Sequence, residues 1–154
     1  MAFWGVPEPI EHAEQCAIDA VSEILQQLVP LNVILKQEFG FTFGIRVGMS
    51  SGVVYGGFVG CSSRLNYTVM GSVVNLAARL EPLNKSFHTQ VLVNELLRAN
   101  CPDHAFRSFG KVSIRGFNKT VDVYEYLGVK KSELKPEEQE KEETTGINTE
   151  QLVH

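Results

Sequence analysis

One short stretch of the sequence, NYTVMGSVVNLAARLE from Asn66 to Glu81, contains polar residues whose types and spacing could do chemistry. Asn75 and Arg79 are four positions apart, so on a helix they lie on one face, one turn apart. An amide beside a guanidinium offers several hydrogen-bond donors and a fixed positive charge, which suit a group that becomes more negative during a reaction, such as a phosphate. The spacing alone still favours an ordinary solvated helix face over a phosphate site, so the surrounding sequence must decide between the two interpretations.

The helix that must present this pair is predicted from Ser72 onward. Leu76, Leu80 and Leu83 recur at helical spacing and mark a core-facing side that excludes Asn75 and Arg79. Ser72 is a good N-cap, because its hydroxyl can accept a hydrogen bond from a free backbone N–H. The polar pair is therefore expected to face away from the core.

The rest of the chain alternates helical and extended patterns. MAFWG is predicted to be the end of a buried strand. The next segment, EPIEHAEQCAIDAVSEILQQL, is predicted to be an amphipathic helix. This helix is expected to break or kink near Pro30 and to continue in an altered direction to Gly40. FTFGIRVGM alternates as a strand does, and a Ser-Ser-Gly turn leads to a second, glycine-rich strand. LNYTVMG, TQVLV and the pair AFRSFGKVSIRG and TVDVYEYLG are further strands, and NELLRAN is a short helix. This order predicts an α+β fold.

Composition excludes several classes of function. The 154 residues suit one domain, and 14 Lys and Arg against 18 Asp and Glu, without a basic run, argue against nucleic-acid binding. Cys16, Cys61 and Cys101 are too far apart for a zinc motif and odd in number, which favours a reducing, cytoplasmic location. No apolar run is expected to cross a membrane, and no signal peptide is recognised.

The sequence changes character after Gly128. Residues 129–154 hold seven Glu and four Lys with few apolar residues, so they cannot bury enough surface to offset the entropy of ordering. We therefore predict a domain over residues 1–128 and an acidic, disordered tail over residues 129–154.

Four segments of the chain resemble, in order, the catalytic domain of class III nucleotidyl cyclases, the adenylate and guanylate cyclases. They are MAFWGVPEP, IRVGMSSGVVYGGFVG, RLNYTVMGSVVNLAARLE and VSIRGFNKTVDVYEYLG. The resemblance covers Met1 to about Gly128. It implies a ferredoxin-like α+β domain that works as a head-to-tail dimer and converts a nucleoside triphosphate into its 3′,5′-cyclic monophosphate and pyrophosphate.

The resemblance also implies roles for individual residues. Asn75 matches the Asn that orients the ribose, and Arg79 matches the Arg that stabilises charge on the phosphates as the 3′-oxygen attacks the α-phosphorus. Thr68 matches the base-reading position, where Thr favours ATP over GTP. Arg115 lies near the usual Lys for the terminal phosphates, with Lys119 as the fallback, although surface charge is an equal alternative for both.

The sequence departs from the family in two places. Ser72 stands where the family usually has Asp, a mild change that removes a negative charge from the helix start. The two metal-binding Asp residues, together with the first strand, the first helices and part of the metal-binding hairpin, would precede MAFWG. Asp19, Asp103 and Asp122 do not match them. Mg²⁺ or Mn²⁺ serves the complete family enzyme, and we expect this chain alone to bind none and to be inactive.

Three hypotheses remain open at this point. The chain is an N-terminally incomplete adenylate cyclase domain, or a non-catalytic partner that lends Asn75 and Arg79 to a complete second cyclase domain, or an unrelated α+β interaction module. In the first two, the expected partners are ATP and a second cyclase domain in a homo- or heterodimer. The lost first strand would also leave strand edges exposed.

Overall fold

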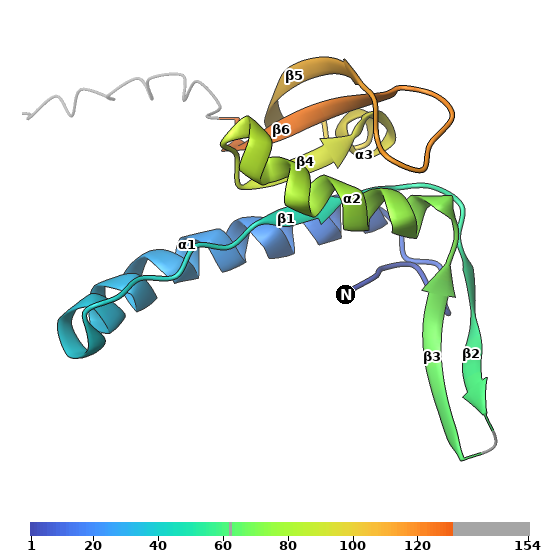
Figure 1. Cartoon of the computed structure of the whole chain (residues 1–154), viewed down its shortest axis with the longest axis horizontal. Coiled ribbons are helices and arrows are strands. Elements are labelled where there is room, and N and C mark those ends of the chain that lie inside the picture. Colours follow the sequence, from blue (N-terminus) through green and yellow to red (C-terminus); the bar gives the residue numbers. More distant parts are fainter. Residues whose placement is uncertain (62, 131–154) are drawn as a thin grey trace, which may run out of the picture.

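The computed structural model describes residues 1–61 and 63–130 as an α+β fold (Figure 1). Its elements follow in the order α1 (Ala13–Phe39), β1 (Val47–Met49), β2 (Tyr55–Cys61), β3 (Arg64–Met70), α2 (Ser72–Phe87), β4 (Val91–Asn94), α3 (Glu95–Ala99), β5 (His104–Val112) and β6 (Val121–Val129). Of the predicted tail, residues 131–154 lie outside the described residues, whereas Val129 ends β6 and the Lys130 backbone N–H donates to the Asp103 carbonyl at 2.9 Å.

Four strands form the main sheet in the order β1-β4-β6-β5. β1 runs parallel to β4, and the other neighbours are antiparallel. β2 and β3 form a separate antiparallel pair, which Figure 1 shows extending away from the rest of the molecule. The sheet is therefore the body of the domain, and the β2–β3 hairpin is an arm attached to it.

The core lies on both faces of this sheet. Val91 and Val93 of β4 pack in one cluster with buried residues of α1, including Ile18, whereas Leu92 between them packs in a second cluster with Leu80 of α2. Successive side chains of a strand point to opposite faces, so α1 and α2 cover opposite sides of the sheet. This fixes α2, the helix with the polar pair, against one face only.

Helix α1 differs from the prediction at Pro30. The helix does not break there but continues to Phe39, and it ends as predicted at Gly40, whose left-handed backbone (φ 77°) lets its N–H donate to the Lys36 carbonyl. Pro30 removes the hydrogen bond to the carbonyl of Gln26. Both residues are exposed, so the Gln26 carbonyl lies on the solvent side of the helix, where water can be its partner.

Two predicted strands are absent or shortened. MAFWG forms no strand and only Trp4 and Gly5 lie in a bend, and of the segment predicted from Phe41 to Met49 only Val47–Met49 pairs with a neighbour. Within the described part of the chain no strand lies beside β1 on the side away from β4. The backbone of Phe43 instead exchanges two hydrogen bonds with the side chain of Asn32 (2.8 and 2.6 Å). The expected open strand edge is thus present at β1.

The uninterrupted α1 also bears on the expectation that no segment could cross a membrane. Of the described residues, α1 forms the one helix that is long and apolar enough to do so by length and composition. Core helices of globular domains pass the same test, and Ala17, Ile18 and Val21 of α1 are buried against the sheet. The finding is therefore weak evidence for a membrane span.

Candidate functional site

The connection between β3 and α2 is made by Gly71. Its backbone (φ 152°, ψ 167°) is in a region that other residues rarely adopt, and it lets the chain turn directly from strand into helix. Gly71 is the N-cap, and no side chain caps the helix. The prediction that Ser72 is the N-cap is therefore wrong: Ser72 is already the first helical residue, where its hydroxyl does not cap the free N–H groups.

Helix α2 presents Asn75 and Arg79 to solvent. Leu76 and Leu80 of the same helix are buried in the core cluster shared with β4 and β6. Asn75 and Arg79 are both exposed, as their helical spacing predicted. Within the described residues neither side chain makes a hydrogen bond or an ion pair that would hold it to the protein surface.

The nearest acidic residue on the helix does not neutralise Arg79. Glu81 lies two positions further on and accepts a hydrogen bond from Arg46 Nε at 3.1 Å. Its carboxylate is therefore directed toward the β1 side of α2 and is already paired. The guanidinium of Arg79 is left as a positive charge available to an external anion.

Arg115 lies in the loop between β5 and β6, which packs on α2. Ile114 is buried, and with Phe117 it belongs to the same apolar cluster as Leu76 and Leu80 of α2. Figure 1 shows this loop beside the first turns of α2. Arg115 itself is exposed, as is Lys119 further along the loop. The structure thus brings the predicted phosphate-binding loop to the helix that carries Asn75 and Arg79.

Thr68 lies on β3, opposite Gly57 of β2. It is half-buried and shares one face of the hairpin with Tyr55 and Met70, which are 73% and 50% exposed. Because β3 runs straight into α2 through Gly71, Thr68 is connected to the polar pair by a short, regular stretch of chain. The hairpin arm therefore positions the predicted base-reading residue, and α2 positions the predicted catalytic residues.

The Asp residues of this chain do not form a metal site. Asp19 Oδ1 lies 3.3 Å from the buried His104 Nε2, Asp122 pairs in register with Lys111 across β6 and β5, and Asp103 lies just before β5. Across residues 1–61 and 63–130 no three His, Cys, Asp or Glu side chains are grouped closely enough to share an ion. The residues present do not fit the two-metal site that the cyclase resemblance implies.

A polar cluster at the base of the hairpin was not predicted. Glu14 Oε1 accepts hydrogen bonds from Ser51 Oγ (2.6 Å) and Asn100 Nδ2 (3.0 Å). The bond from Ser51 lowers the pKa of Glu14. The Asn94 side chain in turn exchanges two hydrogen bonds with the Ser51 backbone (3.0 and 2.9 Å) and caps α3 through Leu97 N. The cluster fixes the turn between β1 and β2; only the Asn94 cap could have been read from the sequence, in the run NELL.

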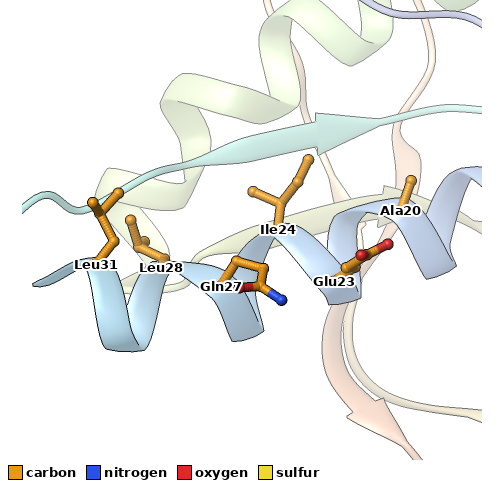
Figure 2. Close-up of a pocket in the computed structure, with 6 residues that line it drawn as sticks. All are labelled: Ala20, Glu23, Ile24, Gln27, Leu28 and Leu31. Carbon is orange, nitrogen blue, oxygen red and sulfur yellow. The ribbon is translucent and has the colours of Figure 1, made fainter.

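One apolar groove lies away from these residues. It is a groove of about 440 Å³ along α1, lined by Ala20, Glu23, Ile24, Gln27, Leu28 and Leu31, as Figure 2 shows. All of its lining residues come from one helix, and none is a predicted site residue. An open groove on one helix face lacks the converging polar groups of a catalytic pocket, so we place the candidate site on α2.

The comparisons with known proteins agree on one family. The family model described as adenylate and guanylate cyclase catalytic domain matches residues 1–128. Adenylate cyclase 1 of Rhizobium meliloti is 37% identical over an alignment of 133 residues that covers 83% of this chain and 19% of that protein. An adenylate cyclase of Anabaena cylindrica is 31% identical over 118 residues, covering 71% of this chain and 24% of that protein. The chain thus spans about a fifth to a quarter of the length of these relatives.

Solved structures show the same fold. The adenylyl cyclase CyaB of P. aeruginosa matches with a TM-score of 0.66 and 25% identity, over 83% of this chain and 66% of that one. The guanylyl cyclase Cya2 matches with a TM-score of 0.70 and 21% identity, over 85% of this chain and 66% of that one. These matches exclude the hypothesis of an unrelated interaction module. The chain belongs to the adenylate and guanylate cyclase catalytic domain family.

Proposed function

We propose that this chain supplies the Asn75 and Arg79 half of an adenylate cyclase active site, which converts ATP into 3′,5′-cyclic AMP and pyrophosphate together with a second cyclase domain. The reaction forms a bond between the ribose 3′-oxygen and the α-phosphorus. The bond from the α-phosphorus to the oxygen that leaves with pyrophosphate breaks, and the 3′-hydroxyl proton passes to a base outside this chain.

One observation carries the proposal. Helix α2 buries Leu76 and Leu80 against the sheet, yet it holds an amide and a guanidinium on its exposed side without partners in the described structure. Glu81, the one acidic residue of α2, is paired with Arg46. The helix fixes the position of the Arg79 backbone, and the unpaired guanidinium is available to stabilise negative charge that develops during the reaction.

The residues of this chain have separate tasks in the proposed reaction. The Asn75 amide hydrogen-bonds the ribose and aligns its 3′-oxygen with the α-phosphorus. The Arg79 guanidinium donates to the phosphate oxygens as negative charge accumulates on them. Thr68 on the hairpin reads the adenine edge, and Arg115, with Lys119 as the alternative, binds the terminal phosphates.

The second domain supplies what this chain does not hold. Divalent cations such as Mg²⁺ or Mn²⁺ would be bound there, because the three Asp residues of this chain do not converge. The hairpin arm supports association, since Tyr55, Phe58 and Leu65 are 73%, 72% and 60% exposed. A two-stranded ribbon with such side chains in water is marginally stable unless another surface covers it.

A mixing experiment tests this function. The chain is combined with the catalytic domain of Rhizobium meliloti adenylate cyclase 1 in which the matching Asn and Arg are replaced by Ala, and cyclic AMP is measured with ATP and Mn²⁺. We expect activity from the mixture and none from either protein alone. Arg79→Ala should lower the restored rate by about 10²–10³-fold, the usual effect of removing one donor to a developing negative charge.

The matched control is Lys85→Ala. It removes a positive charge from an exposed position of the same helix, one that has no proposed role, and should leave the restored rate unchanged. If the mixture with the wild-type chain shows only background activity, or if Arg79→Ala and Lys85→Ala lower the rate equally, then Arg79 does not contribute to an active site shared with the second domain. Replacing ATP by GTP in the same assay tests the base preference assigned to Thr68.

A further inference from the structure

Asn84 is a polar side chain buried at the far end of α2, with 1% of its surface exposed. Its Nδ2 donates to the carbonyl of Val47 on β1 at 3.0 Å and to the carbonyls of Leu80 and Glu81 in its own helix at 3.2 and 3.1 Å. Its Oδ1 accepts from Thr89 Oγ1 at 2.7 Å. Every polar atom of the side chain is thus satisfied, and one of its bonds joins α2 to β1.

Gly48, the residue after Val47, brings the same two elements into backbone contact. A Cβ at this position would lie 2.3 Å from the carbonyl oxygen of Ala77 and 2.4 Å from the backbone nitrogen of Glu81. These two residues flank Arg79 in the helix. Only glycine allows α2 to lie this close to the strand, since ordinary contacts of a Cβ begin near 3.4 Å.

We propose that Asn84 and Gly48 are positioning residues that set the height and rotation of α2 on β1, and thereby the places of Asn75 and Arg79 in the active site. Asn84 holds the C-terminal part of α2 to β1 by its hydrogen bond to Val47. Gly48, which has no side chain, sets how closely the turn of α2 from Ala77 to Glu81, which contains Arg79, lies to β1. This inference rests on the proposed function for its catalytic consequence.

The structure gives the size of the expected displacement. An alanine at position 48 would have to move the α2 backbone by about 1 Å to restore an ordinary contact with the Ala77 carbonyl. A misplacement of about 1 Å in a positioned catalytic group costs about 10²-fold in rate. The loss should appear in kcat with little change in KM for ATP, because the interaction that weakens is the one made in the transition state.

Two pairs of variants test the inference in the mixing assay, with this chain in saturating excess. Gly48→Ala should lower kcat by about 10²-fold, whereas Gly44→Ala, whose Cβ would meet no atom within 4 Å, should leave it unchanged. Asn84→Leu keeps the side-chain volume but loses the bond to Val47 and should also lower kcat. Leu83→Ala, which weakens α2 packing and leaves that bond in place, should lower stability and not kcat.

Hydrogen exchange of the same variants gives a readout independent of activity. The exchange is measured under conditions in which each variant remains folded. We expect Gly48→Ala and Asn84→Leu to speed amide hydrogen exchange in peptides covering residues 44–50 and 75–81, and Gly44→Ala to leave it unchanged. If the wild-type chain restores no activity, the proposed function fails, while exchange still decides whether these residues hold α2 in place. Unchanged exchange, or a kcat loss in Leu83→Ala equal to that in Asn84→Leu, would overturn the inference.

Discussion

Glu14 ties the first turn of α1 to the β1–β2 turn and to the end of α3, and two substitutions separate its charge from its hydrogen bonds. Both donors, Ser51 Oγ and Asn100 Nδ2, bond the same oxygen, Oε1. Glu14→Gln keeps a carbonyl oxygen that can accept both bonds, whereas Glu14→Ala loses both. The pair therefore measures how much of the link between these segments depends on the negative charge.

The magnitudes follow from the geometry. Hydrogen bonds to a charged group contribute about 1.5–3 kcal/mol each and neutral ones about 0.5–1.5 kcal/mol. Because Glu14 is half-buried, water screens part of this. We therefore expect Glu14→Gln to lower the free energy of unfolding at pH 7 by about 1 kcal/mol and Glu14→Ala by about 2 kcal/mol.

The effect of Glu14→Gln should depend on pH. The pKa of Glu14 is lowered in the folded protein from its ordinary value of 4.5, chiefly by the bond from Ser51. Its charge therefore contributes stability above pH 4.5, and that contribution is lost as the pH falls through the lower folded pKa. The stability difference between wild type and Glu14→Gln should be full at pH 7 and should shrink as the pH falls below 4.5 and through the lower folded pKa.

Urea titration at pH 7, 5.5, 4 and 3 provides the assay. Trp4 is the single tryptophan and packs against the core cluster that includes Ile18, so its fluorescence reports unfolding. Glu23→Gln, at an exposed position of the same helix, is the control and should have little effect at any pH. A Glu14→Gln difference that is as large at pH 3 as at pH 7 would refute the role assigned to the charge.

Three further outcomes are expected. Leu80→Ala empties a fully buried site and should cost about 3 kcal/mol of unfolding free energy in urea, whereas Leu96→Ala, at a side chain that is 48% exposed, should cost less than about 0.5 kcal/mol. A disulfide reagent at pH 8 should modify Cys61, whose pKa is lowered by its bond with Ser63, but should reach Cys101 only after unfolding, because burial raises the pKa of that thiol to about 11. Gly71→Ala should destabilise the protein by about 1–3 kcal/mol in the same titration, because alanine resists the backbone conformation at the start of α2.

Local patterns predicted much of the fold. The β3 strand, the α2 helix with Leu76 and Leu80 inward, and the β5–β6 pair follow from periodicity that each segment carries by itself. The exposure of Asn75 and Arg79 followed from the same periodicity. These features could be read from the sequence because the residues that decide them are close together along the chain.

The features that the sequence did not reveal depend on distant residues or on backbone conformation. A strand needs a neighbour, so the alternation of Phe41 to Met49 could not show that only three residues would pair. The helix start depends on the conformation of Gly71, which displaced the cap predicted at Ser72. The bonds from Ser51 to Glu14 and from Asn84 to Val47 join residues that are 37 positions apart in the sequence. The other bonds of Asn84, within its own helix and with Thr89, are local.

The extended segment that precedes β1 has a consequence for the behaviour of the protein at high concentration. FTFGI, residues 41–45, has no charge, and Phe41 and Phe43 are 46% and 55% exposed. Such a segment beside an open strand edge is a template for pairing between molecules and hence for aggregation. Glu38 and Arg46 flank it as charged gatekeepers, and Asn32 occupies the backbone groups of Phe43. Solubility therefore depends on a few polar residues that have no part in the proposed reaction.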